Sequence, residues 1–205
     1  MKIAKLYKSL KNQQIQCTAC NHYCKISPNQ TGICKVRKNI NGKLYAIVYD
    51  KIIAKHIDPI EKKPLYHFLP NTKTFSIGTL GCNLKCDFCQ NFDISQEFLK
   101  IIGEKIKPEQ IVEQAIKNNC KSIAYTYNEP TVFIELAHDT SKLAKKAGLK
   151  NIWVTNGFFS KESARYIDGL IDAANIDLKS FSQNFYKKIC KAKLAPVLEL
   201  SLIHI

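Results

Sequence analysis

Three cysteines stand within eight residues, Cys82, Cys86 and Cys89, in the order C-x3-C-x2-C. Thiolates spaced this closely can bind three irons of a cubane iron–sulfur cluster and leave the fourth iron without a protein ligand. Ferredoxins hold their clusters with four cysteines and only pass electrons, so a loop with three indicates chemistry at an open iron. The alternatives are a zinc site or a redox dithiol. Zinc prefers four ligands and this loop supplies three with no obvious fourth nearby, so the ligand count favours the cluster.

The elements around this loop alternate between strand and helix. Apolar runs bounded by turn residues predict strands at residues 74–79, 121–127, 150–155 and 173–178. Helices are predicted at about 108–119, 131–147, 161–170 and 182–190, with Pro108 at the first helical position and Ser160 as an N-cap. Strands joined by crossover helices form a parallel sheet. The predicted fold class is therefore α/β, a partial (βα) barrel with about four βα units.

Polar residues follow each predicted strand at its carboxyl end. The cysteine loop follows the first strand, Tyr127-Asn128-Glu129 ends the second, Thr155-Asn156-Gly157 the third and Asp177-Leu178-Lys179 the fourth. The carboxyl ends of parallel strands meet at one edge of the sheet, and that edge carries the active site in such folds. We therefore expect these residues to surround one pocket together with the cysteine loop.

A second group of cysteines lies near the amino end. Cys17, Cys20, Cys24 and Cys34 form the pattern C-x2-C-x3-C-x9-C, and Asn41-Gly42 just beyond predicts a hairpin turn between residues 34–40 and 43–50. The four thiols could hold structural zinc, a second iron–sulfur cluster, or no metal at all. His22 could replace one thiolate in a zinc site. The sequence leaves the choice open, but it predicts a small cysteine-rich β module.

The cysteine loop, with Phe88 before its last cysteine, resembles the cluster loop of the radical S-adenosylmethionine (SAM) enzymes. The resemblance implies a 4Fe-4S cluster on Cys82, Cys86 and Cys89, with SAM bound at the open iron. It also implies an electron donor such as flavodoxin or ferredoxin. Reductive cleavage of SAM then gives a 5′-deoxyadenosyl radical, which abstracts hydrogen from a substrate that the sequence does not identify. The protein positions these reactants, whereas the cofactor supplies the chemistry.

The same resemblance implies roles for the strand-end residues. Glu129 stands where the family carries the acid of a Gly-Gly-Glu-like motif, which contacts the SAM amino group, and Asn128 lies beside it. Residues at the positions of Asn156, Asp177 and Lys179 line the SAM carboxylate, the ribose and the substrate side. Phe88, Tyr125 and Tyr127 are expected to present aromatic walls.

Longer motifs resemble one branch of the family, the radical SAM component of the AmmeMemoRadiSam system. They occupy residues 58–70, 76–91 and 125–131, and they include the early cysteine module followed by Val36-Arg37. The resemblance implies a Memo-like protein and an AMMECR-type protein as partners. This branch is related to the pyruvate formate-lyase activating enzymes, so activation of a glycyl radical enzyme is an alternative function.

Composition and charge bear on whether the chain binds nucleic acid, spans a membrane or is secreted. The chain has 205 residues and a net charge of +14, with 31 basic residues of which only Arg37 and Arg165 are arginines. A basic zinc-binding nucleic-acid module is an alternative. However, the lysines are scattered along the chain, arginines that could bind phosphate or bases with two hydrogen bonds are few, and aromatic residues do not alternate with basic ones, which argues against nucleic-acid binding. No apolar run is long enough to span a membrane, and no secretory signal begins the chain. Nine cysteines in such a chain favour metal binding over disulfides and predict a cytoplasmic location.

The predicted organisation has three parts. Residues 1–70 form the cysteine-rich module with its hairpin, and residues 72–199 form an incomplete radical SAM core, because enzymes of this branch continue well past residue 205. Residues 200–205, Leu-Ser-Leu-Ile-His-Ile, resemble the translation of a sequencing-library adapter and are expected to be a non-native tail.

Overall fold

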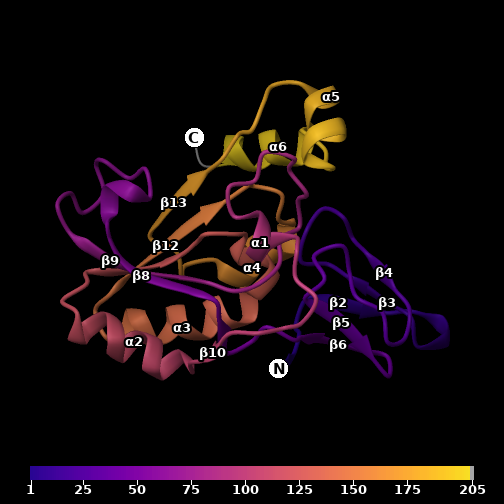
Figure 1. Ribbon diagram of the computed structural model, residues 1–205, viewed down its shortest axis with the longest axis horizontal. Helices are drawn as coiled ribbons and strands as arrows, with labels where there is room; N and C mark the ends of the chain where they lie inside the picture. The colour runs from indigo at the N-terminus through magenta and orange to yellow at the C-terminus, as the bar shows by residue number, and fades with distance from the viewer. Residues whose placement is uncertain (204–205) are drawn as a thin grey trace.

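The computed structural model describes residues 1–203, with side chains described to residue 200 (Figure 1). Its main sheet has five strands in the order β13-β12-β11-β9-β8. These strands are β8 (Ala54–Pro59), β9 (Lys73–Gly78), β11 (Ser122–Tyr125), β12 (Lys150–Thr155) and β13 (Ala173–Ile176). The last four run parallel, as the sequence predicts, whereas β8 pairs antiparallel with β9 at one edge. The α/β fold is therefore confirmed.

Crossover helices cover one face of this sheet. Helix α2 (Pro108–Lys117) packs on β9 and β11, α3 (Ile134–Lys146) packs on β11 and β12, and α4 (Lys161–Ile167) lies beside α3. Pro108 is the first residue of α2, and the Ser160 hydroxyl caps α4 by accepting a hydrogen bond from Ser163 N at 3.1 Å. A short 3₁₀ turn, η3 (Pro130–Phe133), precedes α3 where the sequence predicts one continuous helix.

The opposite face of the sheet is covered by a segment from the first 70 residues. Ala124 and Ile152, on two central strands, pack against Ile60 in η2 (Ile60–Lys62) and against Leu65 and Phe68. Residues 54–59 also enter the main sheet as β8. These residues, grouped with the amino-terminal module by sequence, thus contribute to the central sheet, and the boundary at residues 70 and 72 stays a prediction.

The amino-terminal module contains two small antiparallel sheets (Figure 1). One is built from β1 (Lys2–Ile3), β5 (Arg37–Ile40) and β6 (Lys43–Ala46), the other from β2 (Tyr7–Ser9), β3 (Ile15–Cys17) and β4 (Lys25–Ile26), with η1 (Lys11–Gln13) between β2 and β3. The predicted hairpin joins β5 to β6, and Asn41 and Gly42 have φ values of 51° and 77°. Two positive φ values are typical of a type I′ turn, which Asn-Gly favours.

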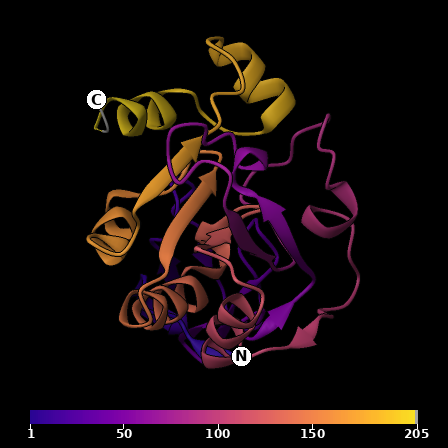
Figure 2. The same ribbon diagram turned by 90° about the vertical axis from the view of Figure 1, so that its left-hand side faces the viewer.

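The remaining elements cover the edges and the carboxyl ends of the strands. Strand β7 (Lys51–Ile52) pairs with β10 (Glu104–Lys105), and the one-turn α1 (Phe92–Ser95) follows the cysteine loop. Residues 182–190, predicted as one helix, form α5 (Gln183–Phe185) and the π-helical turn η4 (Tyr186–Cys190). With α6 (Ala195–Ile203) they lie over the carboxyl ends of β12 and β13 (Figure 2).

Helix α6 includes the first residues of the expected tail. Leu200 is buried against the core, whereas residues 204 and 205 lie outside the described part of the chain, so the expectation of a non-native tail stays untested. No helix within residues 1–203 is long and apolar enough to cross a membrane.

Candidate active site

A cleft of ≈ 560 Å³ opens at the carboxyl ends of the parallel strands. The structure brings together there most of the residues that the sequence singles out. Cys82, Cys86, Cys89, Phe88, Asn128, Asn156, Asp177 and Lys179 all line it, and Glu129 does not. The expectation that four strand ends converge on one rim is therefore met by the geometry.

The cysteine loop is held from both sides. At Gly81, φ is +95° and a Cβ atom would lie 2.7 Å from the Cys34 carbonyl oxygen, so the chain enters the loop through a position that only glycine fits. On the other side, Lys85 N and Asp87 N donate to carbonyl oxygens of η4, those of Cys190 and Ile189, at 3.1 and 3.2 Å. The loop is thus fixed between the amino-terminal module and the carboxyl-terminal segment.

Polar groups contact the sulfur atoms of the loop. Cys82 Sγ accepts hydrogen bonds from Leu84 N at 3.4 Å and from the Asn156 side-chain amide at 3.8 Å, and Cys89 Sγ lies 3.3 Å from Ser95 Oγ. Burial, reinforced by the charge of Glu129, raises the pKa of the Cys82 thiol, and burial raises that of Cys86 to about 12. The thiols must therefore lose their protons when they bind a metal.

The donor set fits a cluster better than a single ion. The loop offers three thiols to the cleft, whereas a structural zinc ion prefers four ligands. A cubane binds each thiolate at a different iron, so its ligands surround a volume and do not converge on a point. Three cysteines on the wall of one cleft, with N–H donors directed at sulfur, meet that requirement.

The position of Glu129 differs from the expected one. Its side chain is fully buried behind the cleft, and its carboxylate accepts hydrogen bonds from Thr131 N, from the hydroxyls of Thr131 and Thr155, and from Asn156 N, at 2.5–3.1 Å. Burial raises its pKa, although these donors oppose the shift. Protein donors thus occupy the carboxylate that the sequence assigns to the SAM amino group. The residue ties the end of β11 to the end of β12, and its contact with SAM stays a prediction.

The two asparagines of the rim have defined partners. Asn128 donates to the carbonyl oxygens of Thr79 and Ile94 at 2.7 and 3.2 Å, while its Oδ1 is buried and has no hydrogen-bond partner among the residues described. Asn156 donates to Asn83 Oδ1 at 2.7 Å in addition to Cys82 Sγ. Asn128 therefore retains a free acceptor, whereas Asn156 cross-links its strand to the cysteine loop.

Asp177 and Lys179 form an ion pair at the far side of the cleft. Lys179 Nζ lies 2.6 Å from Asp177, and its backbone N–H donates to the Tyr186 hydroxyl at 3.0 Å. Burial would lower the pKa of Lys179, but the hydrogen bond that it donates to Asp177 outweighs burial and raises that pKa. The ammonium charge of Lys179 is therefore retained at neutral pH.

The aromatic residues separate into two groups. Phe88 is 52% exposed on the cleft wall, with its ring centroid 5.8 Å from that of Phe185, and Tyr127 also lines the cleft. Tyr125 is fully buried, and its hydroxyl bonds Asn151 and Ser141, so the expected role of Tyr125 as a cleft wall is wrong. In a strand of four buried residues, its side chain belongs to the core.

Sequence reasoning missed two features of the site. Lys62 and Lys63 line the cleft, and both donate to the buried Asp58 at 3.0 and 2.7 Å, as does the Tyr127 hydroxyl at 3.0 Å. Burial opposes the charge of Asp58, but the two ammonium groups outweigh it and hold the pKa of this carboxyl well below its usual range. The available signal is the opposite charge of Asp58 and of Lys62-Lys63 within the 58–70 motif.

The second missed feature is a fourth thiol. Cys190, fully buried in η4, lies within hydrogen-bonding contact of Cys86 on the side away from the cleft. The sequence offers no signal for this contact because the two residues are far apart along the chain. Around them lies an apolar cluster that joins Leu84 of the loop and Phe158 to the carboxyl-terminal residues Tyr186, Ala192, Leu194 and Val197.

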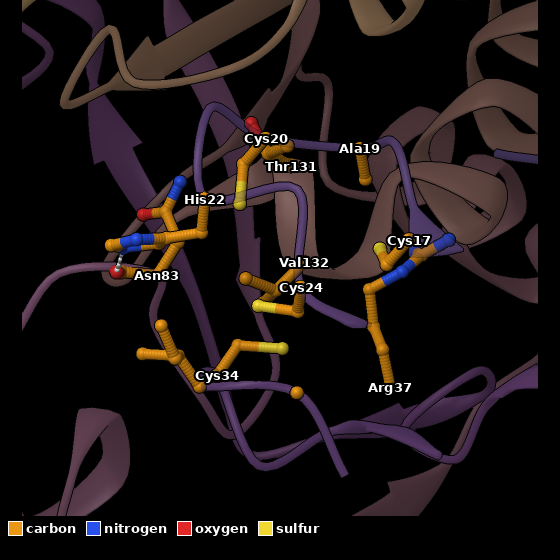
Figure 3. Close-up of a pocket in the computed structure, with 12 residues that line it drawn as sticks. Cys17, Ala19, Cys20, His22, Cys24, Cys34, Arg37, Asn83, Thr131 and Val132 are labelled. Atoms are coloured by element: carbon orange, nitrogen blue, oxygen red, sulfur yellow. Dashed lines mark hydrogen bonds between the residues drawn. The ribbon is translucent and has the colours of Figure 1, made fainter. Parts of the chain in front are cut away.

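The amino-terminal cysteines also come together. Cys17, Cys20, Cys24 and Cys34 line one cavity beside the cysteine loop (Figure 3). The Nε2 atom of His22 lies 2.7 Å from the Asn83 carbonyl oxygen, and its ring packs on Phe158. His22 nevertheless lines the same cavity, so its replacement of one thiolate stays a prediction.

Comparison with known proteins places this geometry in a family. Residues 76–200 match the radical SAM superfamily. The uncharacterized protein MJ0808 of Methanocaldococcus jannaschii is 46% identical over 200 residues, which are 97% of this chain and 59% of that protein. The putative glycyl-radical enzyme activating enzyme MJ1632 of the same organism is 28% identical over 56% of this chain and 44% of its own length. QueE from Escherichia coli aligns with a TM-score of 0.46 at 12% identity, over 73% of this chain and 66% of that one. From the family match, which spans more than half of its residues, the chain belongs to the radical SAM superfamily.

Proposed function

We propose that this chain is the radical-generating part of a radical SAM enzyme, with a 4Fe-4S cluster on Cys82, Cys86 and Cys89 and SAM in the adjoining cleft. When bound, the reduced cluster supplies the electron that cleaves SAM to the 5′-deoxyadenosyl radical used for hydrogen abstraction. The observation that carries the proposal is the position of all three thiols on the wall of one cleft, together with the polar ends of three further strand segments. No fourth cysteine lines that wall among the residues described.

The residues of the cleft would position the cofactor and its ligands. Asn156 and Leu84 direct N–H groups at the sulfur of Cys82, which favours the thiolate that a cluster needs. Glu129 fixes the backbone of Asn156 and so acts as a positioning residue. Asn128 offers its unpartnered Oδ1 as an acceptor, and the Asp177–Lys179 pair offers both charges to a zwitterionic amino acid group such as that of SAM.

The surroundings of the loop suit radical chemistry. The apolar cluster behind the cysteines keeps water from that side of the loop, which limits side reactions. The net charge of +14 favours an acidic one-electron donor such as flavodoxin or ferredoxin, because opposite surface charges speed encounter.

The test is iron loading and SAM cleavage in the absence of oxygen. The chain reconstituted with iron and sulfide is expected to gain about four irons at the loop and the broad visible absorption of a cluster. With a strong reductant it is expected to release 5′-deoxyadenosine from SAM. Cys86→Ala is expected to lose iron loading and the release of 5′-deoxyadenosine. Cys120→Ala, at a buried free cysteine outside both cysteine groups, is expected to keep both. Full iron loading in the triple variant Cys82→Ala, Cys86→Ala, Cys89→Ala would exclude this site.

For the wider role we propose the radical SAM component of an AmmeMemoRadiSam system, with Memo-like and AMMECR-type partners. Glycyl radical enzyme activation is the second candidate, because the matching segment of MJ1632 carries that putative description. The two candidate functions can be distinguished with a protein that also contains the residues equivalent to the further part of the longer relatives. A glycyl radical signal by electron paramagnetic resonance after mixing with a glycyl radical enzyme favours activation. Co-purification with a Memo-like or an AMMECR-type protein favours the first.

A further inference from the structure

We propose that Cys17, Cys20, Cys24 and Cys34 hold one structural zinc ion, which stabilises the amino-terminal module where it supports the cysteine loop of the active site. All four residues line a single cavity (Figure 3). They come from β3, from the turn between β3 and β4, and from the loop that precedes β5. Backbone hydrogen bonds fix these segments to one another, with Cys17 N donating to Cys24 O at 2.9 Å and Tyr23 N donating to Cys20 O at 3.0 Å.

The size and lining of the cavity select the kind of ligand. Its volume is ≈ 10 Å³, which is about one water-sized sphere and suits a single ion. A cubane of four irons and four sulfides needs far more room. The candidate donors on the lining are four thiols and the His22 imidazole, with no carboxylate among them, and such a sulfur and nitrogen set selects an ion such as zinc over magnesium or calcium.

Arg37 gives an independent indication of negative charge in this cavity. Its side chain is 2% exposed and lines the cavity, and both of its Nη atoms donate to Glu135 at 2.8 Å. The remaining donor, Nε, is buried without a partner among the described residues. Four thiolates around a divalent ion carry two negative charges in excess. A buried N–H beside Cys17 is the donor that such a site uses to hydrogen-bond its sulfurs.

The sulfurs surround the cavity and do not converge on one point, since no group of three or more His, Cys, Asp or Glu side chains in the described residues is arranged to hold a metal ion. In Figure 3 the sulfurs of Cys20, Cys24 and Cys34 are directed into a common space, and that of Cys17 lies near the Arg37 guanidinium. Binding would draw them inward by rotation about the one side-chain torsion that each cysteine has. A zinc–sulfur distance measured by X-ray absorption tests whether the side chains rotate in this way.

The module needs such a stabilising group. Its own core is small, with the buried residues Ala4, Ile15, Cys17, Ala19, Ile26 and Leu44. Its strands are two to four residues long, and all of its cysteines are free thiols. Units of this size that lack a large apolar core usually depend on disulfides or a structural metal.

The site also touches the active-site loop. His22, between Cys20 and Cys24, contacts the Asn83 carbonyl oxygen at 2.7 Å, and the carbonyl oxygen of Cys34 fills the space above Gly81. Both contacts fall on the residues that flank Cys82. Ordering of the module by zinc would therefore order the first half of the cluster loop.

The experiment measures zinc and iron in the full 205-residue chain by mass spectrometry after purification without chelators. We expect about one zinc per chain, at a zinc–sulfur distance of about 2.3 Å by X-ray absorption. The zinc is expected to persist in the triple variant of Cys82, Cys86 and Cys89 and to be lost in Cys20→Ser. Cys120→Ser, at a buried cysteine outside the site, is expected to retain it.

Two results would overturn the proposal. One is a wild-type chain without zinc that also fails to bind cobalt at one equivalent with the visible spectrum of a tetrahedral thiolate site. The other is iron and a cluster spectrum that survive in the triple variant, which would place a cluster in the module. The cobalt titration uses the wild-type chain, so a Cys20→Ser protein that fails to fold does not decide the outcome. Zinc in the triple variant is independent of SAM cleavage, so this proposal and the proposed function can fail separately.

Discussion

At the scale of single residues, Glu129 shows how a buried acid can serve a site that it does not touch. The carboxylate collects hydrogen bonds from Thr131, Thr155 and the backbone of Asn156. Asn156 in turn directs its amide at Cys82 and Asn83. The acid thereby fixes the spacing between two strand ends and Cys82.

Replacement of Glu129 by glutamine is expected to destabilise the fold. The carboxamide accepts through one oxygen only, so at least one buried donor loses its partner, at a cost of about 1–3 kcal/mol in the free energy of unfolding. Urea denaturation measures this loss. Glu113→Gln, at an exposed position of α2, is the matched control and should change the stability by less than about 0.5 kcal/mol. Equal stability of the two variants would show that Glu129 has no positioning role.

The contact between Cys86 and Cys190 predicts a disulfide in protein that has lost its cluster. A two-electron thiol oxidant such as diamide removes two electrons and two protons from the pair and is itself reduced to the hydrazine. Because burial raises the pKa of Cys86 to about 12, oxidation should be slow at pH 7 and speed up as the pH rises. Peptide mass spectrometry detects the linked peptides. Their absence, with Cys86 linked to Cys89 instead, would contradict the contact; Cys120→Ala serves as the control.

At the scale of elements, one buried ion pair joins the amino-terminal module to the main fold. Arg37 on β5 and Glu135 at the start of α3 form two hydrogen bonds of 2.8 Å, and both side chains are almost fully buried. Arg37 also borders the proposed zinc cavity. The pair therefore links the metal site, the module and the helix that follows the end of β11.

Breaking this pair is expected to be costly. Glu135→Gln leaves a buried guanidinium without its counter-charge, which typically costs about 3–5 kcal/mol. Burial would raise the pKa of Glu135, but Arg37 lowers it below its usual 4.5. Since the folded pKa is the lower one, this stabilisation is complete above 4.5 and is lost as the pH falls through the folded value. The urea midpoint, measured down to pH 3, should fall more steeply with decreasing pH in wild type than in Glu135→Gln. Glu97→Gln, at an exposed position, is the control and should follow wild type.

Gly81 allows a second test of the contact between module and loop. A Cβ at this position would lie 2.7 Å from the Cys34 carbonyl oxygen, so Gly81→Ala must displace either the module or the cluster loop. We expect reduced iron loading, measured per chain after reconstitution. Gly148→Ala is the control, because its φ is also positive, at +77°, but nothing lies within 4 Å of its Cβ. Equal iron content in the two variants would mean that this contact does not shape the loop.

The same elements show what the sequence could predict. Strand β12, the Asn41-Gly42 turn and the Ser160 cap depend on neighbouring residues, and each was found at its predicted position. The position of Glu129 depends on donors from a strand that is distant in sequence, and local patterns carry no information on that. For the same reason the sequence does not predict that strand β8 joins the main sheet, because its pairing with β9 spans the intervening loop.

At the scale of the whole molecule, the main sheet is unevenly supported. The residues of β11 are all buried between β9 and β12, whereas every residue of β13 is half-buried and, in the described part of the chain, β13 pairs with β12 alone. Beside β13 an apolar pocket of ≈ 210 Å³ lies between the sheet and α4, lined in part by Trp153, Ile167 and Ile176. The chain spans 59% of the length of MJ0808, so the longer relative has further residues that could cover this edge.

This asymmetry predicts a gradient of hydrogen exchange that bears on the cofactor site. Amides of residues 173–176 should exchange roughly tenfold or more faster than those of residues 122–125, because an edge strand opens locally at lower cost. Asp177 and Lys179 follow β13 directly, so the opening of this strand also frees the charged pair on the cleft wall. A longer protein that covers β13 should then protect residues 173–176 and bind SAM more tightly than this chain does. Equal protection of both strands at all protein concentrations would contradict the uneven support; protection that increases with concentration would indicate that a second copy covers the edge.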